Sequence, residues 1–422
     1  MRKPHGSRAQ KTILAAALLL WGASVASAQP ASGPWPSVHH DRQNTARSDD
    51  HNGPQGPNPV IAWENKYSFG RTGVTVDEDG NVYAGNGRQP ITKLDGDTGE
   101  VIWNSHEGIF LGQCDKSTPS LTAGGRVHMG ERGNNMLYVD AETGELLLKS
   151  KFKVDGDVRT SPLILDNGDI IGASGALGNG LTARLKADAP DTPEDPYVWR
   201  NSLRKTILNV VPALSNDGNH VYWGIDRRIV VKQDVETGEE VWRVAPTKRG
   251  AGGSVADHSV TIGPDETVYF HGRDGLFALD PADGEVLWSY GIAARDKIQS
   301  HPALAADGRL YVGVSSKNAY VAAIRPDGEL DWEYPMGRRG NFVNNSGVIG
   351  ADGTFYVTFR RLLMAFEPDG IDHDSNPSTP DRGVLKWSMV FDRTFKNPLA
   401  IGGDGVLYAV NGKSVFKIVD PD

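Results

Sequence analysis

Short runs of hydrophobic residues, separated by two-residue polar turns, recur along most of the chain. In one example, Asp79-Gly80 stands between two strand-like runs that begin at Thr75 and end at Tyr83. Equivalent turns lie at Gly124-Gly125, Asn167-Gly168, Asp217-Gly218, Asp265-Glu266, Asp307-Gly308, Asp352-Gly353 and Asp404-Gly405. Most of these pairs adopt the positive-φ conformations that a tight hairpin needs. Because the turns lie 42 to 52 residues apart, the sequence predicts one β-hairpin unit repeated eight times.

A second repeat, Asp-x-x-Thr-Gly-Glu-x-x-Trp, supports the same architecture. It occurs at 95–103 and 234–242, with weaker copies at 280–288, at 140–148 (ending in Leu148), and shortened at 326–332. Trp199 and Trp387 end two further copies whose turns are expanded. Short strands at this spacing, without helical periodicity, predict an all-β propeller. We interpret the motif as structural, with Thr-Gly forming a turn and the indole packing on the next blade.

The two repeats together predict eight blades of four antiparallel strands, named A to D from the axis outwards. Trp63 precedes the first hairpin, and the last hairpin is followed by one more strand, Ser414 to Val419. We therefore expect the strand 58–64 to be the outer D strand of the blade whose other strands are C-terminal. Such closure removes exposed sheet edges. Seven blades is the alternative if the degenerate third repeat forms no blade.

The tryptophan repeat resembles that of the PQQ-like β-propellers, and the resemblance covers nearly all of the chain after residue 28. That family includes quinoprotein alcohol dehydrogenases and the propeller lipoprotein of the outer-membrane assembly machinery. The segments Trp35-Pro36-Ser37 and 40–44 also look like the family's N-terminal segment. The resemblance implies a PQQ-like propeller fold. It implies no particular function, because propellers host many activities.

The first 28 residues have the composition of a secretory signal peptide. Four basic residues precede an apolar run from Ile13 to Val25, and Ala26-Ser27-Ala28 forms a small-residue cleavage site. We thus expect 1–28 to be removed, 29–57 to be an N-terminal extension and 58–422 to be a single propeller domain. The mature chain would carry 40 Lys or Arg and 53 Asp or Glu, a net charge of −13. It is expected to be periplasmic or secreted, without a transmembrane segment, and monomeric.

Candidate ligand-binding residues come just before each predicted A strand. In propellers, binding and catalytic residues usually lie at this level around the axis. They are nearly all polar or cationic: Arg71, Lys116, Arg159, Asn209, His258, His301, Asn345, Lys396 and Asn397. A wet, polar tunnel without specific function is the alternative explanation of this pattern.

The connections from each D strand to the next A strand are unusually basic. The segments 64–73, 104–118, 149–160, 200–209, 243–256, 289–300, 333–345 and 388–397 hold 19 Lys or Arg and 8 Asp or Glu, a net of +11. Such a surface steers anions, and arginine suits carboxylates. We therefore expect a basic axial face that binds an acidic polysaccharide, a carboxylated small molecule such as PQQ, or an envelope protein. Export argues against nucleic acid.

Two further features bear on metals and cofactors. The loop containing Asp372, Asp374 and Asn376 places oxygen side chains at alternate positions, as in a calcium loop, although a plain solvated loop is the alternative. Cys114 is the single cysteine, so the adjacent-cysteine disulfide of the quinoprotein alcohol dehydrogenases cannot form. The sequence also lacks Cys-x-x-Cys-His, Gly-x-Ser-x-Gly and His-Glu-x-x-His.

Three functions stay open from the sequence. The first is a non-catalytic binding protein or scaffold that uses the basic axial face. The second is a lyase acting on uronate polymers, in which Arg71, Arg159 or Lys396 would stabilise carboxylate charge and His258 or His301 would act as base. The third is a PQQ-dependent dehydrogenase.

Overall fold

The computed structural model describes residues 29–66, 69–86, 91–105, 117–131, 133–151, 158–175, 180–205, 207, 210–225, 228–247, 259–272, 274–293, 296–337, 346–372 and 380–421. Side chains of 69–71 and 86 lie outside this description. The described residues form 33 β-strands and no helix, so they include no helix that could span a membrane. The all-β prediction is confirmed.

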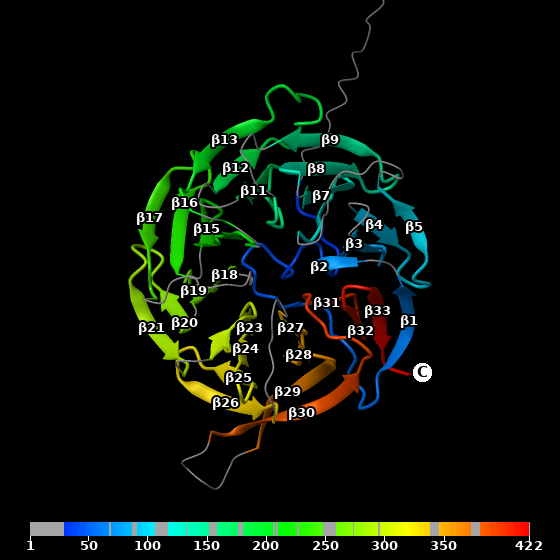
Figure 1. The fold of residues 1–422 in the computed structure, drawn as a ribbon, viewed down its shortest axis with the longest axis vertical. Helices are drawn as coiled ribbons and strands as arrows, with labels where there is room; N and C mark the ends of the chain where they lie inside the picture. The colour runs from blue at the N-terminus through cyan, green and yellow to red at the C-terminus, as the bar shows by residue number, and fades with distance from the viewer. Residues whose placement is uncertain are drawn as a thin grey trace, which may run out of the picture.

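The strands form antiparallel sheets arranged in a ring (Figure 1). In chain order, the first sheet contains β2 (Phe69–Val76), β3 (Val82–Asn86), β4 (Ile91–Leu94) and β5 (Val101–Asn104), and the second contains β6 (Ser120–Thr122), β7 (Arg126–Glu131), β8 (Asn135–Asp140) and β9 (Leu146–Lys151). The third sheet contains β10 (Leu163–Ile164), β11 (Ile170–Ser174), β12 (Leu181–Leu185) and β13 (Tyr197–Ser202). The fourth contains β14 (Ala213–Leu214), β15 (His220–Ile225), β16 (Ile229–Asp234) and β17 (Glu240–Val244). The most degenerate repeat, the third, thus forms a four-stranded sheet like the others.

The remaining sheets follow the same order. The fifth sheet contains β18 (Val260–Ile262), β19 (Val268–His271), β20 (Gly275–Leu279) and β21 (Val286–Gly291). The sixth sheet has nine strands: β22 (Lys297–Ile298), β23 (Ala303–Leu304), β24 (Leu310–Ser315), β25 (Tyr320–Ile324), β26 (Leu330–Pro335), β27 (Val348–Ile349), β28 (Phe355–Phe359), β29 (Leu362–Asp372) and β30 (Arg382–Val390). The last sheet contains β31 (Ala400–Ile401), β32 (Val406–Val410), β33 (Ser414–Val419) and β1 (Val60–Lys66). The strand expected at 58–64 is β1, shifted by two residues, and it pairs with β33.

The nine-stranded sheet joins the five strands β22 to β26 to the four strands β27 to β30 through one contact between their outer strands. Glu333 of β26 and Arg382 of β30 form a parallel pair, in which the Glu333 amide donates to the Asp381 carbonyl at 2.9 Å. The long β29–β30 hairpin therefore reaches over the edge of β26 and covers Trp332, which is fully buried. Its extension projects from the lower rim of the ring in Figure 1.

All eight predicted hairpin turns between the A and B strands are confirmed. Their second turn residues have positive φ: Gly80, Gly125, Gly168, Gly218, Glu266, Gly308, Gly353 and Gly405. Glu266 is the one non-glycine among them, at φ 67°. These turns, like those between C and D strands, lie at one face of the ring, because strand direction alternates within each sheet. The D–A connections consequently lie at the opposite face.

The tryptophan motif holds neighbouring sheets together, as the sequence predicts. Trp103 of β5 donates its indole N–H to the Ala141 carbonyl in the next sheet at 3.2 Å. Gly144, which the Trp103 indole covers, has φ 75°, and a Cβ there would lie 2.8 Å from the indole. The same contact recurs where Trp63 packs on Gly99 and Trp288 packs on Gly328. Glycine is required at this position by both its backbone angle and the closeness of the indole.

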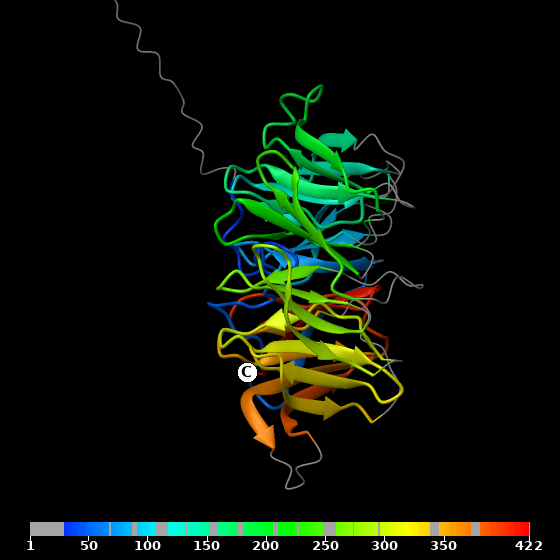
Figure 2. The same cartoon turned by 90° about the vertical axis from the view of Figure 1, so that its left-hand side faces the viewer.

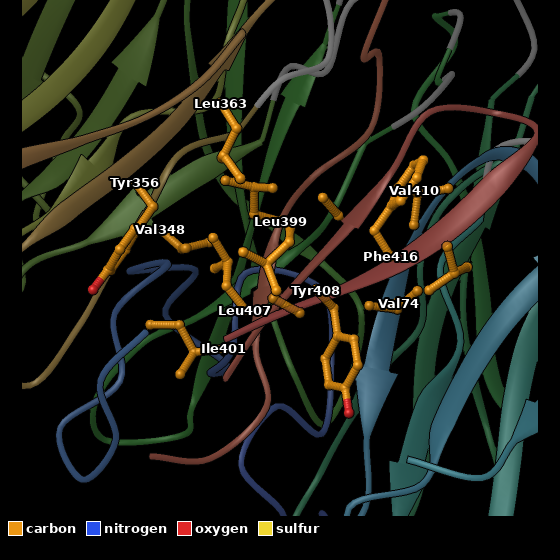
Figure 3. Close-up of a cluster of buried hydrophobic side chains, with 14 of the residues drawn as sticks. Val74, Val348, Tyr356, Leu363, Leu399, Ile401, Leu407, Tyr408, Val410 and Phe416 are labelled. Carbon is orange, nitrogen blue, oxygen red and sulfur yellow. The ribbon is translucent and has the colours of Figure 1, made fainter. Parts of the chain in front are cut away.

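Hydrophobic cores fill the spaces between adjacent sheets. The core in Figure 3 joins the last sheets of the chain to the first, with Val348, Leu363, Leu407 and Phe416 beside Val74. Because residues near both ends of the described chain contribute, this core stabilises the join between the ends.

Substitutions at Gly144 and Gly125 separate the energetic cost of a packing clash from the cost of backbone strain. We expect Gly144→Ala to lower the free energy of unfolding by about 2–4 kcal/mol, since the new methyl meets the Trp103 indole at an unfavourable φ. The control is Gly125→Ala, which has φ 71° but open space around it, and should cost about 1 kcal/mol. Urea unfolding would measure both, and equal losses would contradict a packing role for Gly144.

Candidate functional site

The residues 29–57, here called the axial segment, run across the centre of the ring (Figure 1) and along the face that carries the A–B turns (Figure 2, left). Their main-chain carbonyls accept hydrogen bonds from innermost strands around the ring. The donors are the amides of Val76, Leu121, Leu214, Ile262, Leu304 and Ile349, and the acceptors are the carbonyls of Trp35, Pro36, Arg42, Gln43, Thr45 and Ala46, all at 2.8 to 2.9 Å. One segment thus satisfies inner-strand amides of five sheets, two of the six amides, those of Leu304 and Ile349, being in the nine-stranded sheet.

The backbone of the axial segment is contorted to reach these partners. His39, His40, Asn44 and Ala46 all have positive φ, between 56° and 73°. Asparagine and histidine adopt the left-handed region more readily than most residues, whereas alanine rarely does, and a residue held there typically costs on the order of 1–3 kcal/mol. The turns direct successive carbonyls outwards to different sheets, so the hydrogen bonds offset the strain.

Asn44 is the centre of this arrangement. Its side-chain amide donates to the carbonyls of Val211, Pro212 and Val260 at 3.0 to 3.3 Å, and its own carbonyl accepts from His301 Nε2 at 2.7 Å. Since a carbonyl can only accept, Nε2 of His301 must carry its hydrogen. One buried asparagine therefore links three sheets and the axial segment.

His301 also stacks on His39, with ring centroids 3.9 Å apart and an interplanar angle of 5°. Both side chains are buried, and His39 Nε2 lies 3.0 Å from Ser346 Oγ. Burial lowers the pKa of His39 to about 3, against the opposing charge of Asp41, so His39 is neutral near pH 7. The stacked rings form a contact between the axial segment and the residues just before β23.

The structure describes only some of the predicted ligand-binding residues. His301 is buried in the contact just described, and Asn397 is buried with Nδ2 donating to the Thr72 carbonyl at 2.8 Å. Arg159 is half-buried before β10, Lys396 is exposed, and Arg71 lies within β2 with its side chain undescribed. Lys116, Asn209, His258 and Asn345 lie outside the described residues. So do Lys248-Arg249 and Arg338-Arg339, the adjacent basic pairs of the D–A connections. The binding role of this set stays a prediction.

Buried hydroxyls occupy the same level of the axis and link adjacent inner strands. Ser117 Oγ donates to the Thr160 carbonyl at 3.0 Å, and Ser161 Oγ accepts from the Thr118 amide at 2.9 Å. Ser259 Oγ accepts from the Val211 amide at 3.0 Å. Polar side chains at this level therefore hold the described ring together, in the way that His301 and Asn397 do.

The predicted metal and cofactor sites find little in the described residues to support them. Asp372 is exposed at the end of β29, paired in register with Arg382, while Asp374 and Asn376 lie outside the described part. Among described residues, no group of three His, Cys, Asp or Glu is placed to hold a metal ion. PQQ and calcium therefore stay predictions.

Comparison with known proteins identifies the family. A family model described as outer membrane protein assembly factor BamB matches residues 189–301 and 226–420, which together span more than half of the chain. The chain belongs to this family. The two matches overlap because neighbouring repeats resemble each other enough to align in more than one register. The resemblance to PQQ-like propellers is confirmed.

One relative in this family is outer membrane protein assembly factor BamB of Burkholderia pseudomallei (strain K96243). It is 26% identical over 247 residues, which cover 55% of this chain and 58% of the relative. The match thus spans less than two thirds of that relative's length. BamB from Moraxella catarrhalis is a similar solved structure, with TM-score 0.62 and 16% identity over 86% of this chain and 100% of that one.

Quinohemoprotein alcohol dehydrogenases share the architecture as well. The enzyme from Comamonas testosteroni has TM-score 0.71 and 13% identity over 92% of this chain and 81% of its own. ADHIIG from Pseudomonas putida HK5 has TM-score 0.69 and 13% identity over 94% and 82%. At these identities the likeness shows the fold alone.

Substitutions at Asn44 test the arrangement at the axis. Asn44→Gly keeps the left-handed backbone accessible but removes the amide, and we expect it to lower the free energy of unfolding by about 1–3 kcal/mol through unpaired buried carbonyls. Asn44→Ala should cost about 1 kcal/mol more, because φ 58° disfavours alanine. Chemical denaturation would show this order, and a stability equal to wild type for both variants would contradict it.

Acidification should destabilise the fold through its buried histidines. An unfolded His39 or His128 takes up a proton near pH 6.5, whereas burial lowers both folded pKa values to about 3. The unfolded chain therefore binds more protons between these values, and the free energy of unfolding falls as pH drops from 6.5 towards 3. We expect His39→Asn to reduce the slope by about 1.4 kcal/mol per pH unit between pH 6 and 4.5. Unchanged slope in unfolding titrations would refute this.

Proposed function

We propose that the protein is an exported, eight-bladed PQQ-like propeller that serves as a binding scaffold for a protein partner in the bacterial envelope. The observation that carries this proposal is the basic character of the D–A connections, +11 within a chain whose overall charge is −9. A surface of this kind attracts and orients acidic groups before contact. Membership of a family named for outer-membrane protein assembly supports a protein as the partner.

The blade count and ring closure are part of this proposal. Support comes from the eight A–B hairpins and from β1, which pairs with β33 as an outer strand. The two units within the nine-stranded sheet, β22 to β26 and β27 to β30, count as separate blades, since a single parallel contact joins them. A closed ring gives a rigid platform on which loops can bind without large rearrangement.

The described contacts favour a structural role over a catalytic one for His301. As the sequence-derived candidate for a general base, it would need to reach a substrate proton. Its Nε2 instead donates to the buried Asn44 carbonyl, and its ring lies flat against His39. An acidic glycan or a carboxylated small molecule remains the runner-up ligand for the same basic surface, on the same charge argument.

The adjacent basic pairs Lys248-Arg249 and Arg338-Arg339 supply a direct test. We expect chemical cross-linking in cells to join the wild-type protein to an envelope protein, and Lys248→Glu, Arg249→Glu, Arg338→Glu and Arg339→Glu together to reduce that product at least about 10-fold. The matched control is reversal of four exposed acidic residues on outer strands and turns: Glu100, Glu145, Glu239 and Glu285 to Lys.

A second measurement separates binding from the other ligand and activity classes. Polygalacturonate and neutral dextran would be compared as immobilised ligands for the purified protein. Binding to polygalacturonate without an envelope cross-link would favour the glycan ligand over the protein partner. Turnover of polygalacturonate to unsaturated products, or of an alcohol in the presence of added PQQ and calcium, would overturn the scaffold proposal.

A further inference from the structure

A cavity of about 560 Å³ lies on the face opposite the D–A connections, between the axial segment and the inner ends of the sheets that begin with β6, β10 and β14. Its volume falls in the range of small-ligand sites in proteins, about 300–1,000 Å³. Hydrogen bonds fix one wall to the ring, since the Ala31 and Leu121 amides donate to the Leu121 and Pro36 carbonyls at 3.1 and 2.9 Å. The cavity is therefore preformed.

The lining combines apolar walls with carboxylates. Leu163, Ile164 and Val211 form apolar wall, together with several prolines of the axial segment. Asp41, Asp50 and Asp166 contribute the carboxylates. Burial raises the pKa of Asp41, but the nearby His40 imidazole and hydrogen bonds from the Thr45 hydroxyl and amide outweigh it, so the pKa lies below its usual value and the group is ionised.

The one arginine in the lining already has a partner. Arg42 Nη1 lies 2.7 Å from Asp166 Oδ1, which balances its charge. Asp41 and Asp50 leave the cavity with excess negative charge. Apolar walls with carboxylates suit an amphipathic cation, whose aliphatic stem packs against carbon while its charged head reaches oxygen. Lysine and arginine side chains have this form.

The surrounding face has the same sign of charge. The A–B turns 77–81, 122–126, 165–169, 215–219, 263–267, 305–309, 350–354 and 402–406, with the C–D turns 95–100, 140–145, 186–196, 234–239, 280–285 and 325–329, hold 29 Asp or Glu and 4 Lys or Arg, a net of −25. The Glu of each Asp-x-x-Thr-Gly-Glu repeat is exposed there, as at Glu100, Glu145 and Glu239. Such a field attracts polycations over distances of about 10 Å.

We propose that this cavity and the acidic face around it bind a lysine- or arginine-rich extended segment of a partner protein, with one basic side chain inserted into the cavity. This site lies on the opposite face from the proposed envelope-partner surface, and it does not depend on that proposal. The protein would then hold a basic partner on one side of the ring and an acidic partner on the other.

The test uses a fluorescein-labelled peptide of ten lysines and the full-length mature protein. We expect anisotropy to show binding that weakens as salt rises, and carbodiimide to cross-link lysines of the peptide to Asp50 and to carboxylates of the A–B and C–D turns. Asp50→Asn combined with Asp166→Asn should weaken binding about 10-fold, because it removes two carboxylates and leaves Arg42 unpaired in the cavity.

The control makes the same charge change away from the cavity. Glu239→Gln combined with Glu285→Gln neutralises two exposed turn residues and should weaken binding less than about 3-fold. Equal loss in both double variants would overturn the cavity site and leave a general charge effect. Absence of binding, or cross-links mainly to the D–A face, would overturn the whole proposal. Envelope cross-linking through the D–A loops should be unchanged in all these variants, so failure of either proposal is recognisable separately.

Discussion

The innermost strands of the ring have amides that point towards the axis, and the structure depends on giving these amides partners. An unpaired buried amide costs about as much as a lost hydrogen bond, so an open axis would need water at each one. Here the carbonyls of residues 35–46 satisfy six of them in succession. The positive φ angles, the buried Asn44 and the stacked histidines all follow from placing these carbonyls at the correct angles.

Contacts at the outer rim are repeated, whereas those at the axis are unique. Most motif tryptophans pack on a glycine of the following repeat in nearly the same way, so the loss of one contact affects a single interface. The axial segment contacts most sheets at once, and a change there affects many interfaces together. This difference explains why sequence repeats mark the rim clearly, while the axial residues have no repeat of their own.

The sequence was sufficient for the elements that follow local rules. Asn-Gly and Asp-Gly turns, the alternating hydrophobic runs and the tryptophan spacing predicted the hairpins and their packing, because backbone angle and periodicity determine those features. The course of residues 29–57 was not predictable in this way, since many of its bonds join residues far apart in the sequence, such as Asn44 and Val211, which are 167 positions apart. The clue was present in Asn44 and in the polar run around it, but single-sequence reasoning could not show that these residues fill the axis. His301 was identified as a site candidate by position, and only its neighbours reveal the contact with Asn44.

The pairing of β1 with β33 has a consequence for the order of folding. Ser414 Oγ donates to Glu64 at 2.7 Å across 350 positions, and the Asp420 carboxylate accepts from the amides of Gln55 and Gly56 across more than 360. Contacts of such long sequence separation form slowly, because the chain must first close a very large loop. The last sheet therefore stays incomplete until nearly the whole chain is available, and β1 has no strand to pair with during that interval. A newly made chain would be most prone to aggregation, and most in need of a chaperone, before Asp420 binds the amides of Gln55 and Gly56.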